Sequence, residues 1–480
     1  MKYFLQKIYL FYREHPISQY ALAQISGTLF GLNNIFGLFF LLFLIVTTKS
    51  KNILFLVLLF FSPLPIIQNY YKIPKKNSYI KGEGIFIPYS QSLLENKLWK
   101  IQGKLIYFTN NYTKEKHRNI SCCIFFHKKL SLYKNYKVLG KLINKNIHYY
   151  VLQGSIKLIK NKKNLKSFGL FFNKKISKKI DQHFKNSEVN SFLKSIFLGH
   201  PLTSEIKQNF QKLGISHMLI ISGFHFSFII SISSIIFYCL PYKLKLCLIF
   251  IVITSFMIIL HPSPSITRAW TSYTLTLIAA ICSRSCSNIT KLSFSSLVIL
   301  TINPLNILNI SFQFSFLSTL GIILFHPFIK EIFFINSNNN LSKLKKILIN
   351  AINTLINYLS ITISAQVFII PLLITNFHKL YLGTFFYNIL FSPLIQISII
   401  LFVLSYFLQI TLLFPLVSKY ISWVLYLTIN PPILFKTIWV TSKFSNYWFF
   451  FYFILFFCTG ILIFLKKENT KITYKKYINI

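Results

Sequence analysis

Acidic residues are scarce in this sequence of 480 residues, which has 9 Asp and Glu against 52 Lys and Arg and a formal net charge of +43 at pH 7. Glu331 is the only carboxylate between Ile206 and Lys467. Proton relays and cation sites in membranes usually need buried Asp or Glu, so this half of the chain is poorly suited to either. An AT-rich genome also raises the content of lysine, asparagine, isoleucine and phenylalanine, but it does not explain the missing acids.

The sequence lacks the motifs of several enzyme classes. There is no phosphate-binding loop for nucleotide hydrolysis, no His-Glu-x-x-His motif and no His-x-His-x-Asp-His metal cluster. Ser222 and His225 form no Gly-x-Ser-x-Gly elbow and have no carboxylate to orient the histidine, which disfavours a serine hydrolase. We therefore predict a protein that is not an enzyme and that holds no metal and no cofactor.

The seven cysteines do not indicate a disulfide framework. Five lie in or beside apolar segments, where a free thiol behaves as a small apolar group. Cys122 and Cys123 are adjacent and could pair only through a strained bond. No cleavable signal peptide is evident, because the first 16 residues are basic and aromatic without a small-residue cleavage site.

Apolar residues are abundant, at 54% of the sequence, and aromatic residues make up 18%. Several windows exceed the roughly 18 consecutive apolar residues that mark a transmembrane helix. We predict a polytopic α-helical membrane protein with an inserted small β domain. Residues 1–70 are expected to hold a basic N-terminus and two transmembrane helices, Tyr20–Thr48 and Ile53–Gln68, with glycines that allow close helix contact.

Residues 71–190 have a different character, with short period-two runs separated by Asn, Lys and Gly. About five short strands in this space fit a small soluble barrel. The stretch Tyr70–Asn190 contains 26 basic and 5 acidic residues, interleaved with aromatic residues such as Trp99. A basic surface with aromatic platforms suits single-stranded nucleic acid. A solvated lysine-rich surface over an aromatic core accounts for the same composition.

The rest of the chain is predicted from its apolar pattern. Residues 191–213 alternate apolar and basic side chains around Pro201, which predicts amphipathic interfacial helices. Residues 214–440 form the helical membrane core, and 441–480 hold a last transmembrane helix and a basic tail that the positive-inside rule places in the cytoplasm. The predicted spans are Ile215–Leu240, Leu244–Leu260, Ile266–Cys282, Leu292–Leu308, Ile310–Ile329, Ile347–Ile374, Leu382–Leu413, Val417–Val440 and Trp448–Leu465.

The stretch Leu213–Phe228 combines polar residues with an otherwise apolar sequence, LGISHMLIISGFHFSF. Polar groups at membrane depth are costly unless they face protein or water, so this stretch is a candidate functional site. In a continuous helix His217 and His225 would lie about 12 Å apart, too far to share a metal ion. They are either hydrogen-bonded within the helical bundle or exposed to a polar passage.

Other polar residues lie near prolines or have no acidic partner in the sequence. Arg268 has no nearby acid, and Gln366 and Asn388 precede Pro371 and Pro393. Free backbone groups at helix breaks are tolerated where they are buried or line a cavity. Together these residues predict a pathway lined by His217, Ser222, Gly223, His225, Arg268, Gln313, Ser315, Gln366 and Asn388, with helix breaks at Gly214, Pro304, Pro371 and Pro393.

The same stretch resembles the signature G-x-x-H-L-L-x-I-S-G-x-H of the ComEC competence proteins, the inner-membrane channels for transforming DNA. Met218 and Ile220 replace the usual residues. The matching positions are Gly214, His217, Leu219, Ile221, Ser222, Gly223 and His225. The resemblance continues in order through Arg268-Ala269, Asn303-Pro304, Phe312-Gln313 with Ser315-Phe316, Ala365-Gln366 with Pro371, and Asn388 with Pro393.

This resemblance implies a channel that passes single-stranded transforming DNA into the cytoplasm during natural competence. It also implies a location in the cell inner membrane, an OB-like domain outside the cytoplasm, and two partners: a periplasmic DNA receptor and a cytoplasmic helicase-type ATPase. The chain departs from the family at Gly199-His200, where Gly-Asp is usual, and no metallo-β-lactamase-like domain follows the last span, so a nuclease role is not expected. The alternative is a secondary transporter or permease for a small anionic solute, which broken helices and basic residues suit equally.

Overall fold

The computed structural model describes most of the chain between residues 12 and 460. The expectations for the N-terminal lead, for Pro201, for most of the last span and for the basic tail fall on residues outside this part. The described residues are 12, 15–32, 36–47, 53–65, 67, 79–93, 98–111, 116–127, 130, 136–146, 149–158, 165–200, 202–219, 221–260, 263–335, 343–377, 379–381, 383–408, 413–431, 438–440, 452, 455–456 and 459–460.

In the described part of the chain before the β domain, three short helices take the place of the two predicted long ones. The predicted span Tyr20–Thr48 consists of α2 (Pro16–Gly31) and α3 (Phe36–Thr47), and α4 covers Ile53–Phe61. The sequence explains the division, because Gly31 with Asn33 and Asn34 shortly after it is a helix C-terminus signal. Glycine permits the close packing: a Cβ on Gly27 would lie 1.9 Å from the carbonyl oxygen of Phe60 in α4.

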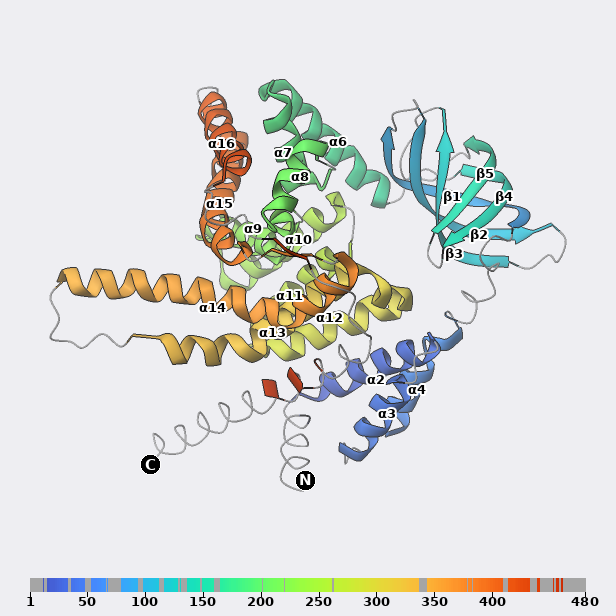
Figure 1. The fold of residues 1–480 in the computed structure, drawn as a ribbon, viewed down its shortest axis with the longest axis horizontal. Coiled ribbons are helices and arrows are strands. Elements are labelled where there is room, and N and C mark those ends of the chain that lie inside the picture. Colours follow the sequence, from blue (N-terminus) through green and yellow to red (C-terminus); the bar gives the residue numbers. More distant parts are fainter. Residues whose placement is uncertain are drawn as a thin grey trace.

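The β domain is a closed barrel of five strands (Figure 1). The strand order is β1-β2-β3-β5-β4, in which only β3 and β5 pair in parallel. Alternate residues point inward, and the fully buried ones, such as Phe86 and Phe108, form one apolar core. The strands are β1 (Tyr79–Leu93), β2 (Trp99–Asn110), β3 (Lys116–Phe126), β4 (Tyr136–Asn146) and β5 (Tyr149–Leu158).

Three helices lead from the barrel to the apolar half: α6 (Leu165–His183), α7 (Ser187–Leu198) and α8 (Ser204–Lys212). The helix α6 lies within the stretch expected to belong to the β domain, and it packs against α10 (Tyr242–Ile259). The lysine-rich composition of this segment matches that of the β domain, but its buried face carries a helical pattern. Gly169 permits the contact, since a Cβ there would lie 2.0 Å from the carbonyl oxygen of Ile258.

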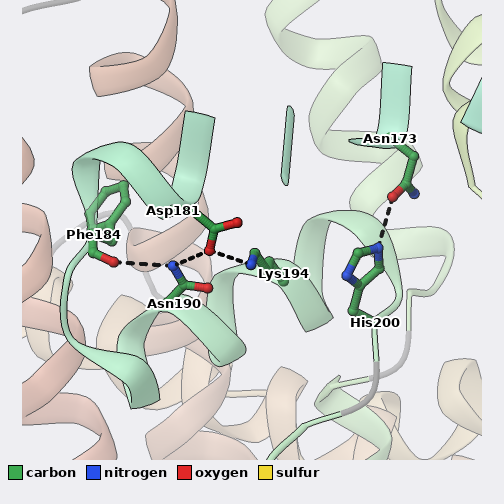
Figure 2. Close-up of polar contacts among 6 residues, drawn as sticks. All are labelled: Asn173, Asp181, Phe184, Asn190, Lys194 and His200. Atoms are coloured by element: carbon green, nitrogen blue, oxygen red, sulfur yellow. Dashed lines mark hydrogen bonds and ion pairs between the residues drawn. The ribbon is translucent and has the colours of Figure 1, made fainter. Parts of the chain in front are cut away.

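Polar contacts fix α6 against α7 (Figure 2). Asp181 accepts hydrogen bonds from Lys194 and, at 2.9 Å, from Asn190. These donors, Lys194 first, hold the pKa of the Asp181 carboxyl below its ordinary value. At the end of α7, His200 Nε2 lies 2.8 Å from Asn173 Oδ1.

The Asn173 amide group determines the proton position on His200. Asn173 Nδ2 donates to the carbonyl oxygens of Leu198 at 3.4 Å and Ile259 at 3.2 Å, so its Oδ1 is the acceptor. His200 Nε2 therefore carries the proton and donates. Burial, followed by the charge of Lys194, lowers the pKa of His200.

The apolar half is helical, as predicted, and the chain is a polytopic membrane protein. Within the described residues, four helical segments are long and apolar enough to cross a membrane: Tyr242–Ile259, Ile310–Phe333, Leu344–Asn376 and Thr384–Tyr406. The remaining elements, in chain order, are η1 (Ser216–Leu219), α9 (Gly223–Ile236), α11 (Pro264–Ile281), α12 (Asn288–Ile302), η2 (Pro304–Leu308), α13 (Ile310–Phe333), α14 (Lys343–Phe377), β6 (Lys379–Tyr381), α15 (Thr384–Leu408), α16 (Leu413–Ile429) and β7 (Ile438–Val440).

Three predicted spans are interrupted in the structure. Ile215–Leu240 is divided into η1 and α9, and Leu292–Leu308 into α12 and η2. Pro304 explains the second division, because a residue before proline disfavours the helical conformation, and Asn303 is extended with φ −155°. The span Val417–Val440 stops with α16, where Asn430 and two prolines follow, and β7 then pairs with β6.

Pro371 and Pro393 do not break their helices, contrary to the prediction. The helices α14 and α15 continue through them. Proline at position 371 leaves the carbonyl oxygen of Val367 without its usual donor. The Tyr452 hydroxyl donates to that oxygen at 2.7 Å, which replaces the missing backbone hydrogen bond.

Candidate functional site

The candidate site begins at a sharp turn after α8. Gly214 has φ +73°, a conformation that side-chain-bearing residues rarely adopt. A Cβ on this glycine would lie 2.1 Å from Thr384 Oγ1, at the start of α15. Gly214 therefore ends the preceding helix, as predicted, and lets the histidine-containing segment pack directly against α15.

The N-terminus of α9 is formed by the predicted Ser222-Gly223 break. Ser222 has extended backbone and is the N-cap residue. Its N–H donates to His225 Nδ1 at 3.2 Å, so the histidine ring folds back over the start of its own helix. A neutral His225 then carries its proton on Nε2. This side chain is 5% exposed, and within the described part of the chain Nε2 has no hydrogen-bond partner.

Arg268 connects this helix start to two other helices. It lies on α11, and its Nε donates to Ser315 Oγ on α13 at 2.7 Å. Its Nη2 lies 3.8 Å from the position that a Cβ on Gly223 would occupy. We call Ser222, Gly223, His225, Arg268 and Ser315 the α9 cluster.

The α9 cluster is electropositive and has no acid of its own. Arg268 contributes a cation, and α9 contributes the positive end of its dipole, where the N–H groups of the first turn point out of the helix. The N–H of His225 in this turn is already bonded to the Ser222 carbonyl oxygen at 3.1 Å. Among the residues that the structure describes, Arg268 forms no ion pair with a carboxylate, and Glu331 is the only acid in the sequence between Ile206 and Lys467. Such an arrangement can bind an anion by charge and by hydrogen bonds.

Two other predicted pathway residues have buried acceptors without a partner in the described part of the chain. These atoms are Gln366 Oε1 on α14 and Asn388 Oδ1 on α15. Buried polar atoms usually have a partner in the protein or an ordered water. Thr274 Oγ1 on α11 has the same status, and sequence reasoning missed it. No sequence signal distinguishes Thr274 from Thr271, whose hydroxyl donates to the helix backbone.

The remaining predicted residues are placed differently. His217 lies on η1 with an exposed side chain and makes a hydrogen bond with the Gly214 backbone. Gln313 Nε2 donates to the carbonyl oxygen of Ile307 at 2.9 Å and so holds the end of η2. Both have roles in local structure that the sequence pattern did not reveal. In the described residues, no group of three or more His, Cys, Asp or Glu side chains could hold a metal ion.

Comparison with known protein families identifies a match over more than half of the chain. Residues 199–467 match the model of a family described as "Competence protein". This region includes His217, the α9 cluster and all the later pathway candidates. No curated protein and no solved structure matches the chain.

Proposed function

The chain belongs to the competence protein family, and from this premise we propose that it is the inner-membrane channel for single-stranded transforming DNA. The family assignment supports a role in DNA uptake. The observation that carries the finer proposal is the α9 cluster, where α9, α11 and α13 present a cation and hydrogen-bond donors without any acid.

The chemistry of the substrate explains why such a cluster is useful. A single strand carries a negative charge at every phosphate and cannot enter hydrocarbon, so it needs a hydrated route with donors and few acids. Arg268 would attract the phosphate, while the N–H groups at the start of α9 and His225 Nε2 would donate to its oxygens. One fixed cation with neutral donors holds each phosphate weakly, so the strand can move on.

The unpartnered acceptors support the same proposal. Gln366 and Asn388 present carbonyl oxygens that have no protein donor in the described part of the chain. Water or the amino groups of the bases would satisfy them, whereas hydrocarbon would not. In a purely structural bundle, each would be expected to hydrogen-bond to a neighbouring helix.

We also propose how the rest of the molecule takes part. The barrel has the strand order of a five-stranded OB fold, and we place it outside the cytoplasm, where it would meet incoming DNA. The channel performs no covalent chemistry and needs no cofactor. The energy for transport would come from a cytoplasmic helicase-type ATPase, and a periplasmic DNA receptor would deliver the strand.

A deletion strain tests this function. We expect the strain to lose transformation but still to accumulate labelled DNA outside the inner membrane, because only the final crossing is blocked. Plasmid-borne expression of the chain should restore transformation. Normal transformation in the deletion strain would refute the proposal.

A permease for a small anion is the second candidate, because the α9 cluster could also bind a single phosphate or carboxylate. Proteoliposomes containing the full chain would distinguish the two. We expect no saturable uptake of radiolabelled phosphate. Uptake that depends on Arg268, together with normal transformation in the deletion strain, would favour the permease.

A further inference from the structure

The outer face of the barrel carries an ordered set of lysines on β1, β4 and β5. The strand register places Lys81 opposite Lys141, across the β1–β4 pair. It also places Lys137 opposite Lys157, across the β4–β5 pair. The side chains of these four lysines are exposed. We call them the lysine face.

One apolar residue lies between the two lysine pairs. Leu139 is 43% exposed, and its neighbours across the strands are Glu83 and Ser155. Glu83 is the only acid in these rows, and it forms an ion pair with Lys137 at 2.8 Å. The lysine face therefore keeps a strong positive charge around an exposed leucine.

The charge on this face suits a ligand of the opposite sign. Like charges that face each other across neighbouring strands repel, and here four lysines stand against one acid. Glu83 offsets part of the charge of the Lys137–Lys157 pair, and the lysine excess favours a bound polyanion.

The spacing of the pairs shows what size of ligand fits. Lys137 and Lys141 are four residues apart on β4, which corresponds to about 14 Å at roughly 3.4 Å per residue. One phosphate ion cannot contact both pairs over that distance. An extended chain of phosphates can contact both, and Leu139 offers an apolar contact for a sugar or a base between them.

We propose that the lysine face binds the phosphate backbone of single-stranded DNA. This inference rests on the function proposed above and adds a specific surface to it. The surface lies on β1, β4 and β5, and not on the strand 2–3 face through which five-stranded barrels of the OB type commonly bind nucleic acids. The face would hold the strand before it reaches the α9 cluster.

Binding of a fluorescent oligothymidylate to the full chain in phosphatidylcholine nanodiscs tests the proposal. The dissociation constant is measured by fluorescence anisotropy over a series of salt concentrations. The variant Lys81→Gln/Lys141→Gln removes one lysine pair, and Lys137→Gln/Lys157→Gln removes the other. The matched control, Lys207→Gln/Lys212→Gln, removes the same charge from exposed positions on α8.

We expect each barrel variant to bind the oligonucleotide more weakly than the wild type does. We also expect its affinity to depend less steeply on the salt concentration. Each phosphate contact on a single strand contributes about 0.7 to the slope of log affinity against log salt, so losing two contacts lowers the slope by about 1.4. The control should retain the wild-type slope.

Two results would overturn the inference. One is an unchanged slope in both barrel variants, or no oligonucleotide binding by the wild-type chain. The other is a difference between the barrel variants and the wild type that occurs only when the nanodiscs contain phosphatidylglycerol. This result would identify the lysine face as a contact for lipid headgroups. Either result, with a deletion strain that fails to transform, would reject the lysine face and leave the channel proposal standing.

Discussion

At the scale of single residues, Arg268 carries the only fixed charge in the α9 cluster. We predict that Arg268→Gln lowers transformation at least tenfold while the protein remains in the membrane at its normal abundance. A hydrogen bond to a charged group contributes about 1.5–3 kcal/mol, and a factor of ten corresponds to about 1.4 kcal/mol. Transformation frequency and quantitative immunoblotting of membranes measure the two quantities.

Arg284 provides the control for this experiment, because it is exposed after the end of α11 and outside the α9 cluster. Arg284→Gln should leave transformation unchanged. Ser315→Ala keeps the charge of Arg268 but removes its 2.7 Å contact, so it should have a smaller effect than Arg268→Gln. Equal losses of abundance and of transformation in Arg268→Gln would instead indicate a packing role.

Two glycines of the same segment should respond differently to alanine. Gly214→Ala should lower the melting temperature of the purified protein, because φ +73° costs a side-chain-bearing residue about 1–2 kcal/mol and the new methyl group would meet Thr384. Gly223→Ala should preserve the melting temperature, because its nearest neighbours lie 3.8 and 4.0 Å away. A destabilised Gly223→Ala variant would contradict the described packing at the start of α9.

The sequence was informative about residues whose backbone chemistry is local. The Ser222-Gly223 break and the turn at Gly214 follow from residue type and appear in the structure. The contact of Arg268 with Ser315 joins residues 47 positions apart, and the structure was needed to show it. Gln313 illustrates what the sequence pattern cannot distinguish. A polar residue in an apolar helix can line a pathway, or it can hold the end of a neighbouring helix, as Gln313 does by donating to the carbonyl oxygen of Ile307.

At the scale of elements, Tyr452 compensates for the proline in α14. We predict that Tyr452→Phe destabilises the protein by about 1–3 kcal/mol, because the Val367 carbonyl loses its donor. In a Pro371→Ala background the backbone N–H of residue 371 returns, so the same substitution should cost much less. A double-mutant cycle on thermal unfolding measures this coupling. Equal costs in both backgrounds would show that Tyr452 does not replace the missing backbone donor.

The contact between α6 and the end of α7 should depend on pH. Burial lowers the pKa of His200, so the neutral form is favoured in the folded state. The stabilisation of the folded state by neutral His200 is present above the ordinary histidine pKa. It is lost as the pH falls through the lower pKa that His200 has in the folded state. We predict a melting temperature that declines as the pH falls below about 6.5, the ordinary pKa of histidine, and a smaller decline in His200→Gln, whose amide can still donate to Asn173.

Lys194 and Asp181 influence His200 in opposite directions, which provides a control. Asp181→Asn removes the acid that raises the pKa of folded His200, so the decline should extend to a lower pH and become larger in total. If His200→Gln shows the wild-type decline, the pH dependence comes from another group.

Element boundaries were the least predictable part of the fold. Hydropathy alone joined α2 and α3 into Tyr20–Thr48, although their packing against each other requires a turn between them. The helix α6 was hidden because its lysine-rich surface resembles that of the barrel, and its buried face appears only once α10 is present to cover it. Pro371 appeared to be a helix break because its compensating donor, Tyr452, is 85 positions away from Val367.

At the scale of the whole molecule, composition was sufficient for the architecture. Scarce acids and long apolar runs predicted a polytopic helical protein, and period-two runs predicted a five-stranded barrel. Composition does not determine on which side of the membrane the barrel lies, because a long soluble insertion can cross regardless of its charge. That placement is therefore the property of the whole molecule that most needs an experiment.

We predict that the barrel faces away from the cytoplasm. In a variant whose seven natural cysteines are alanine, Asn111→Cys places a thiol at the exposed turn that follows β2. A membrane-impermeant maleimide should label it in intact spheroplasts. Thr470→Cys, in the basic tail, should be labelled only after permeabilisation, because the positive-inside rule places that tail in the cytoplasm. The reverse pattern would put the barrel, with its lysine face, on the cytoplasmic side, where it could receive a strand only after the crossing.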